Sequence, residues 1–262
     1  MLSDRPKFQI ISIVANELDL LRLTLPASID SLTKNSKHSY ELILQVDGAA
    51  EESIGKIIKM RDDLKIDEIR IRNKQNKNFI CPGDPSNNSH FHALSGKSDY
   101  TIEIESDVIA VLEESGYDAL GRIVDFFDRH TDVCLISSVI DYDCWAWKLE
   151  DVGVQLEENV RNVNRVSSHF LIYHNQRFLD FTQKNGIYSF TKYSDDNNYE
   201  DVISKALVKS RIPIAFFENW EVKVRHCDEK EYDGSLYYKR IPELKKKIAR
   251  KMIRKYSYKR HE

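Results

Sequence analysis

Apolar strand runs and helical repeats alternate along the first half of the chain, and this alternation most limits its possible folds. Apolar runs at residues 8–14 and 40–46 are typical of buried strands, and a third strand is expected at residues 68–72. Leucine and isoleucine recur every three to four residues over 18–32 and 54–64, which predicts two helices. The alternation therefore predicts an α/β fold with a mostly parallel sheet flanked by helices, and ligands bind such sheets beyond the carboxyl ends of the strands.

The next predicted strand ends in two carboxylates separated by one residue. Apolar and polar residues alternate over 100–104, which predicts a half-buried strand whose tip carries Glu105 and Asp107. Residues 15–17 and Asp47 follow the first two strands, so these strand ends should converge at one edge of the sheet. Carboxylate oxygens there suit Mg²⁺ or Mn²⁺ bound to substrate phosphates, although an isolated acid pair in a chain with 31% charged residues is more simply a solvated turn.

The second half of the chain continues the alternation, with one irregular stretch. Residues 140–164 have no clear period and hold Trp145 and Trp147 among acidic residues, which indicates a loop or a lid. The elements predicted around it are helices at 117–127, 176–184 and 199–209, and strands at 133–139, 167–173, 212–217 and 221–224. The last two strands are expected to close the sheet.

Composition indicates a globular, cytoplasmic protein. The 262 residues are 41% hydrophobic and hold few glycines and prolines, so most of the chain should fold. No window of about 18 apolar residues occurs, and the N-terminal residues lack the apolar core of a signal peptide. The four cysteines are scattered without the spacing of zinc or redox motifs, which indicates reduced thiols.

The last 24 residues are strongly basic. Residues 239–262 hold eleven Lys or Arg against two Glu, a net charge of +9, whereas the whole chain carries −3. Apolar residues recur at helical spacing within this tail, which predicts a basic amphipathic helix suited to an anionic membrane surface. A helix docked on the acidic body is the alternative. Nucleic acid is not expected as a partner, because only the tail is basic and no groove-reading motif accompanies it.

Six short motifs between residues 8 and 230 occur in an order that is similar to one family. They are Ile13-Val14-Ala15-Asn16-Glu17, Val46-Asp47-Gly48-Ala49, residues 88–100, Glu105-Ser106-Asp107, Tyr199-Glu200-Asp201 and Arg225-His226. This order resembles the GT-A glycosyltransferases of the family 2 type, which use a nucleotide-sugar donor. Two features depart from the family pattern: Glu105 replaces the first aspartate of the Asp-x-Asp motif, and residues 73–87 lack an arginine signature.

The resemblance implies a donor site built from strand ends. Asp107 would bind Mn²⁺ or Mg²⁺ on the donor diphosphate, and Glu105 would contact the ribose or a metal-bound water. His226 would be a further metal or diphosphate ligand, although a structural role explains this histidine equally well. His169 shows no ligand spacing and is interpreted as structural. The other implied donor-binding residues are Ala15, Asn16, Glu17, Asp47 and Ser106.

The resemblance also implies the catalytic and acceptor residues. Asp201, next to Glu200, would be the general base that deprotonates the acceptor hydroxyl as it attacks opposite the leaving group, which inverts the anomeric configuration. Acids at a helix start also complement the helix dipole, which is the structural alternative. Trp145 and Trp147 would stack on the acceptor sugar, or they pack the loop onto the body.

The expected protein is thus a metal-dependent, inverting glycosyltransferase with a GT-A-type, Rossmann-like sheet. Its domain would span residues 1–238, with a nucleotide-binding half at 1–110 and an acceptor-binding half at 111–238, followed by the basic tail at 239–262. The acceptor would be a hydroxyl of a glycan or lipid-linked glycan in cell-surface polysaccharide biosynthesis, met at the inner face of the membrane. The alternatives are a sugar nucleotidyltransferase, disfavoured because no glycine-rich phosphate loop follows the first strand, and a catalytically silent glycosyltransferase-like module.

Overall fold

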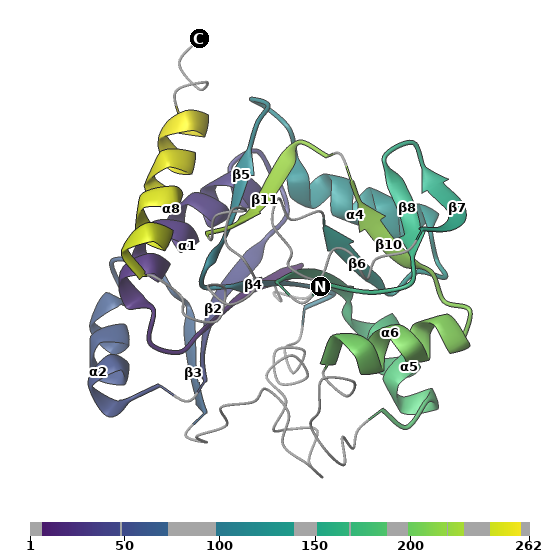
Figure 1. The fold of residues 1–262 in the computed structure, drawn as a ribbon, viewed down its shortest axis with the longest axis horizontal. Coiled ribbons are helices and arrows are strands. Elements are labelled where there is room, and N and C mark those ends of the chain that lie inside the picture. Colours follow the sequence, from purple (N-terminus) through teal and green to yellow (C-terminus); the bar gives the residue numbers. More distant parts are fainter. Residues whose placement is uncertain are drawn as a thin grey trace, which may run out of the picture.

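The computed structural model describes residues 7–47, 49–72, 98–138, 151–167, 169–187, 199–218, 220–227 and 242–257. Within them a nine-stranded sheet has the order β3-β2-β1-β4-β9-β6-β10-β8-β7, and β11 and β5 form a separate two-stranded ribbon (Figure 1). The strands are β1 Phe8–Val14, β2 Tyr40–Asp47, β3 Glu68–Arg72, β4 Tyr100–Glu105, β5 Val108–Leu112, β6 Leu135–Ser138, β7 Asp151–Glu157, β8 Val160–Val163, β9 Phe170–His174, β10 Ile214–Phe217 and β11 Val222–His226. The helices are α1 Leu18–Thr33, α2 Glu51–Met60, α4 Ala119–Arg129, α5 Asn175–Lys184, α6 Tyr199–Lys209 and α8 Pro242–Ser257.

The N-terminal half of the sheet is parallel, as the alternation of strands and helices predicted. β1 lies between β2 and β4, with Ile13 in register with Gln45 on one side and Glu105 on the other. β3 extends the sheet beyond β2 in the same direction. Because all four strands are parallel, the residues that follow β1, β2 and β4 meet at one edge, which confirms the predicted convergence of the acidic strand ends.

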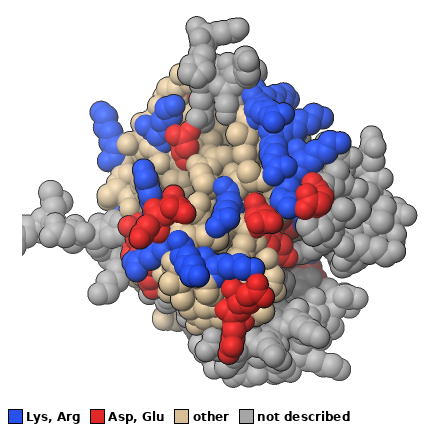
Figure 2. Space-filling view, turned by 90° about the vertical axis from the view of Figure 1, so that its left-hand side faces the viewer, with Lys and Arg blue, Asp and Glu red and all other residues tan. Residues whose placement is uncertain are grey.

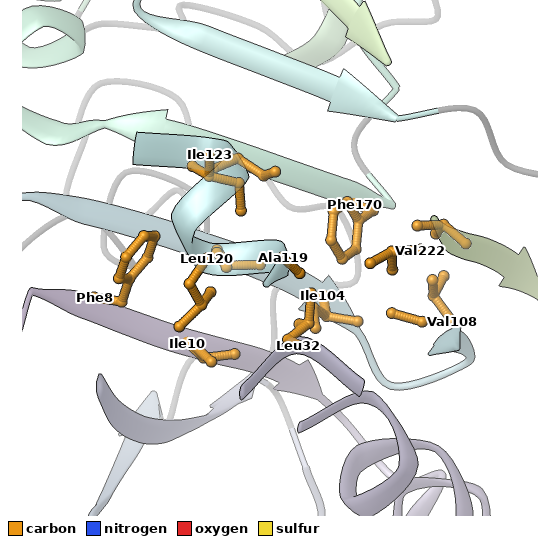
Figure 3. Close-up of a cluster of buried hydrophobic side chains, with 14 of the residues drawn as sticks. Phe8, Ile10, Leu32, Ile104, Val108, Ala119, Leu120, Ile123, Phe170 and Val222 are labelled. Atoms are coloured by element: carbon orange, nitrogen blue, oxygen red, sulfur yellow. The ribbon is translucent and has the colours of Figure 1, made fainter. Parts of the chain in front are cut away.

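Helices cover both faces of the sheet. α1, α2 and α4 bury their apolar sides on one face, where Leu120 and Ile123 of α4 lie over Phe8 and Ile104 of the strands (Figure 3). α5 and α6 pack a second cluster onto the other face of β6, β9 and β10 (Figure 1). β1 and β2 supply apolar side chains to both faces, which explains why their runs are continuously apolar rather than alternating.

Antiparallel strands enter in the second half and correct two predictions. Part of the predicted 140–164 loop is a hairpin of β7 and β8, while residues 139–150 lie outside the described part. β9 runs antiparallel to both β4 and β6. β11 does not close the main sheet, since it pairs with β5 over Val222 to His226, and that pairing carries His226 back to the turn after β4. The pairings of β9 and β11 join segments that are distant in the chain, so no local pattern of the sequence predicts them.

The C-terminal helix α8 docks on the body through its apolar side (Figure 1). Ala249, Met252 and Ile253 pack with Leu20 of α1 and Val111 of β5. Among the described side chains of α8, these apolar residues thus lie against the body, as expected for the alternative of a docked helix. No helix in the described part of the chain has the length and apolar character needed to cross a membrane.

Glu157 at the end of β7 ties the hairpin to α4. Its carboxylate accepts hydrogen bonds from Arg122 and from Arg129 at 2.9 Å, and it lies 3.0 Å from the ring of His130. Partial burial alone would favour the protonated acid, but the arginine hydrogen bonds outweigh it and lower the pKa of Glu157. The carboxylate therefore stabilises the fold only while it is ionised.

We expect Glu157→Gln to destabilise the protein by about 1–2 kcal/mol at neutral pH, because the charge-assisted bonds are lost. A lowered pKa in the folded state means that this contribution is complete above the unfolded-state pKa of about 4.3 and is lost as the pH falls through the folded value. Urea unfolding from pH 7 down to pH 3 measures it. The variant and the wild type should converge in stability at the acid end, and a constant difference across the range would contradict the assignment.

Candidate active site

The turn between β4 and β5 is held from three directions. The Ser106 amide donates to the Ile13 carbonyl at 3.0 Å, and the Thr24 hydroxyl of α1 donates to the Ser106 carbonyl at 2.8 Å. The Cys227 amide, which follows β11, donates to the Asp107 carbonyl at 2.8 Å. Because β1, α1 and the end of β11 all fix this turn, the acidic side chains on either side of it are held in place by rigid elements.

Glu105 lies within a compact group of metal-binding side chains. One carboxylate oxygen lies 2.6 Å from Nδ1 of His169, and the Glu105 amide donates to the His169 carbonyl at 3.2 Å. His226 completes the group, since one ligand atom from each of the three residues lies within 4.8 Å of the others. The two imidazole rings meet edge to face, with centroids 5.0 Å apart.

This group, the Glu105–His169–His226 cluster, has the chemistry of a transition-metal site. A carboxylate oxygen and two imidazole nitrogens suit Mn²⁺ better than Mg²⁺, which favours oxygen ligands and bound water. Burial alone would raise the pKa of Glu105, but the charge and hydrogen bond of His169 prevail and lower it. The carboxylate is therefore ionised at neutral pH, as a metal ligand must be.

The Asp107 side chain is directed at the C-terminal helix. Its Oδ2 atom lies 2.6 Å from Nζ of Lys245 in α8 and 3.5 Å from Nε2 of His226. Asp107 is 1% exposed and Lys245 is 2% exposed. The prediction that Asp107 binds the cation remains a prediction, and in this structure an ammonium group already contacts the carboxylate.

The other strand-end residues lie at the same edge. The Asn16 side chain accepts a hydrogen bond from the Ala50 amide at 3.2 Å, which links the turn after β1 to the turn after β2. The Asn16 amide in turn donates to the Glu17 carboxylate at 3.1 Å. Ala15, Glu17 and Asp47 are all half-buried, and Asn16 is exposed. These residues therefore form a polar rim beside the β4–β5 turn.

Arg165 holds both predicted catalytic carboxylates. Its guanidinium lies 2.8 Å from Glu200 and 3.2 Å from Asp201, at the start of α6, and the arginine is 6% exposed. A planar guanidinium fixes the orientation of the carboxylates that it contacts. His169 lies only four residues further along the chain, so the segment between β8 and β9 contacts Glu200 and Asp201 with one end and Glu105 with the other.

Three residues of this site could not be found from the sequence. His169, Lys245 and Arg165 belong to no spacing motif, and each joins the site through a contact with an acid at least 35 residues away. The predicted His226 is brought to the turn by the β5–β11 pairing. Trp145 and Trp147, predicted to bind the acceptor, lie outside the described residues.

Comparison with models of protein families and with curated proteins finds no match. Solved structures do match. The structure of residues 1–349 of S. aureus TarS in complex with UDP-GlcNAc superposes with a TM-score of 0.52 at 12% identity, over 87% of this chain and 60% of that chain. GalNAc-T7 with UDP, GalNAc and Mn²⁺ gives a TM-score of 0.55 at 11% identity, over 86% of this chain and 44% of that chain. The chain has a GT-A-type fold.

This result confirms the fold class expected from the sequence. At such low identity the match shows the architecture, and the chain spans less than two thirds of the length of either of these solved chains. Within the GT-A-type fold, the Glu105–His169–His226 cluster lies at the carboxyl edge of the parallel strands, where α/β sheets bind their ligands.

Proposed function

We propose that the chain is a metal-dependent, inverting glycosyltransferase that moves a sugar from a nucleoside-diphosphate sugar to a hydroxyl of a glycan or lipid-linked glycan. The observation that carries the proposal is the Glu105–His169–His226 cluster at the ligand-binding edge of a GT-A-type sheet. Solved structures with this fold include complexes with UDP-GlcNAc and with UDP and Mn²⁺. A phosphorylated ligand would bind against the rigid β4–β5 turn and the polar rim beside it.

In this proposal the cluster residues bind Mn²⁺, with Mg²⁺ as the weaker alternative. The metal would neutralise the charge of the donor diphosphate and of the departing nucleoside diphosphate. The rim residues Ala15, Asn16, Glu17 and Asp47, together with Ser106 of the β4–β5 turn, bind the nucleoside part of the donor. These assignments rest on position, because each residue lies at or beside the carboxyl end of β1, β2 or β4.

Asp201 is proposed as the general base of the transfer. The acceptor hydroxyl attacks the anomeric carbon, the bond from that carbon to the diphosphate oxygen breaks, and its electron pair leaves with the nucleoside diphosphate. The hydroxyl proton passes to the Asp201 carboxylate. Arg165 orients the Asp201 and Glu200 carboxylates. A single displacement from the face opposite the leaving group inverts the configuration.

Turnover of a panel of nucleotide sugars with a mixed glycan acceptor, with and without Mn²⁺, tests the proposal. We expect transfer from one donor, and we expect Asp201→Asn to lower the rate by about 10²–10⁴-fold while donor binding persists. Asp125→Asn, which changes an exposed carboxylate on α4, is the matched control and should retain full activity.

Two outcomes would refute this proposal in favour of the alternatives. Release of pyrophosphate from a nucleoside triphosphate and a sugar 1-phosphate would identify a nucleotidyltransferase. Donor binding without turnover of any acceptor would identify a silent binding module.

The exposed side of α8 is proposed to hold the enzyme at the anionic inner face of a cytoplasmic membrane, where lipid-linked acceptors lie. Lys247, Arg250, Lys251, Arg254 and Lys255 share this side and are all exposed. In Figure 2, which views the face that carries α8, Lys and Arg side chains gather in a cluster at the upper right. Because the apolar side of α8 is docked on α1 and β5, the attraction is electrostatic, without insertion of the helix.

Replacing Lys247, Lys251 and Arg254 together by glutamine should weaken binding to vesicles that contain phosphatidylglycerol by about 10²-fold, since each cation near such a surface contributes about 1 kcal/mol. Sedimentation with vesicles at low and high salt measures the effect. A variant with three exposed lysines of α5 and α6 changed to glutamine (Lys184, Lys205 and Lys209) carries the same charge change away from α8 and should bind as the wild type does. Equal losses in both variants, or binding insensitive to salt, would refute a specific role for α8.

A further inference from the structure

Lys245 is a buried cation in the middle of the candidate site. It comes from α8, lies 138 residues after Asp107 in the chain, and is among the largest fully buried side chains of the described protein. Lysines are rarely buried without a partner of opposite charge, because removing an ammonium group from water is costly. The contact of 2.6 Å with Asp107 supplies that partner.

Lys245 contacts the same Asp107 oxygen that a metal ion bound beside His226 would use. Oδ2 of Asp107 lies 2.6 Å from Nζ of Lys245 and also 3.5 Å from Nε2 of His226, a member of the Glu105–His169–His226 cluster. A divalent cation bound to this same oxygen would lie next to the ammonium group, and their mutual repulsion in a buried site would be strong. Lys245 and a metal ion therefore compete for Asp107.

From this geometry we infer that Lys245 is a positioning residue that selects the metal ligands of the proposed enzyme. Its ammonium group pairs with the Asp107 carboxylate and keeps it out of the ligand set, so that the metal ion is bound by Glu105, His169 and His226. The inference rests on the metal dependence in the proposed function. It also makes α8 part of the site. A domain boundary at residue 238 would therefore leave Lys245 outside the domain that holds the other site residues.

The test measures Mn²⁺ binding to the full chain by calorimetry, with no donor present. Glu105→Gln should weaken the binding by about 10–100-fold, because a ligand is lost. Lys245→Met should tighten the binding by about tenfold, because the released Asp107 adds a negative oxygen to the ligand set.

The double variant Asp107→Asn with Lys245→Met decides the question even if Lys245→Met alone folds poorly. It leaves no unpaired buried charge, and its dissociation constant for Mn²⁺ should stay within about threefold of the wild-type value. A loss of more than about tenfold in this variant would overturn the inference, because Asp107 would then be a required ligand. Failure of the wild-type protein to bind Mn²⁺ would overturn it as well.

Lys223→Met is the matched control. Lys223 lies at the far end of the β5–β11 ribbon, where it pairs with Glu113 at 3.6 Å, and its loss should leave Mn²⁺ binding unchanged. Donor turnover is measured in parallel. Mn²⁺ binding that follows the expected pattern in a protein that turns over no donor would refute the proposed function and leave the role of Lys245 intact.

Discussion

Replacing Glu105 by glutamine is expected to lower the rate of Mn²⁺-dependent sugar transfer by about 10²–10³-fold. The carboxamide keeps the size of the side chain but removes the one negative charge of the Glu105–His169–His226 cluster, and with it most of the attraction for a divalent cation. The lowered pKa of Glu105 means that this charge is present at neutral pH in the wild-type protein. Initial transfer rates over a range of Mn²⁺ concentrations measure the effect, and excess Mn²⁺ should restore part of the activity.

Glu113→Gln provides the control for the Glu105 substitution. Glu113 follows the far end of β5, and its carboxylate is partly exposed and paired with Lys223. This variant should keep its transfer rate and its dependence on Mn²⁺. An unchanged rate in Glu105→Gln, or a similar loss in both variants, would show that the cluster does not bind the catalytic metal.

Replacing Lys245 by methionine is expected to lower the free energy of unfolding by about 3–5 kcal/mol, because it leaves the buried Asp107 carboxylate without its cation. Both side chains are almost fully enclosed, so water cannot take over the role of the ammonium group. Urea unfolding followed by circular dichroism measures the change. The double variant with Asp107→Asn should recover most of the loss, since it removes both charges together.

Lys246→Met is the control on the same helix. Lys246 pairs with Glu243 and Asp19, whose side chains are exposed, so water replaces these contacts and the unfolding curve should hardly change. If Lys245→Met were no more destabilising than Lys246→Met, the contact between Lys245 and Asp107 would not be a strong, buried ion pair.

The parallel half of the fold could be predicted from the sequence because its strands and helices are signalled locally. The runs at Phe8–Val14 and Glu68–Arg72 coincide with β1 and β3, and the predicted helix at 199–209 coincides with α6. The period and the apolar content of each segment predict its secondary structure without information from the rest of the chain. The β7–β8 hairpin was not predicted, although Val152, Val154 and Leu156 alternate with less apolar residues as in a strand.

The candidate site was only partly predictable, for the same physical reason. Glu105 and Asp107 were singled out because they end a strand, and their position at the ligand-binding edge follows from the parallel order of β1, β2 and β4. His169 was interpreted as structural because no spacing motif contains it. The antiparallel pairing of β9 with β4 brings it to Glu105, and such a pairing depends on partners 64 residues apart.

By itself, the sequence determined the α/β architecture, the edge of the sheet where acidic residues meet, and the amphipathic character of the tail, because all three are encoded in local periodicity and strand order. Only the tertiary structure decided which groups those acids contact. It paired Asp107 with Lys245, Glu105 with His169, and Glu200 and Asp201 with Arg165. It also covered the apolar side of α8 with α1 and β5. These contacts form between segments distant in the chain, and they are selected by burial and charge neutralisation in the folded protein, which no local pattern records.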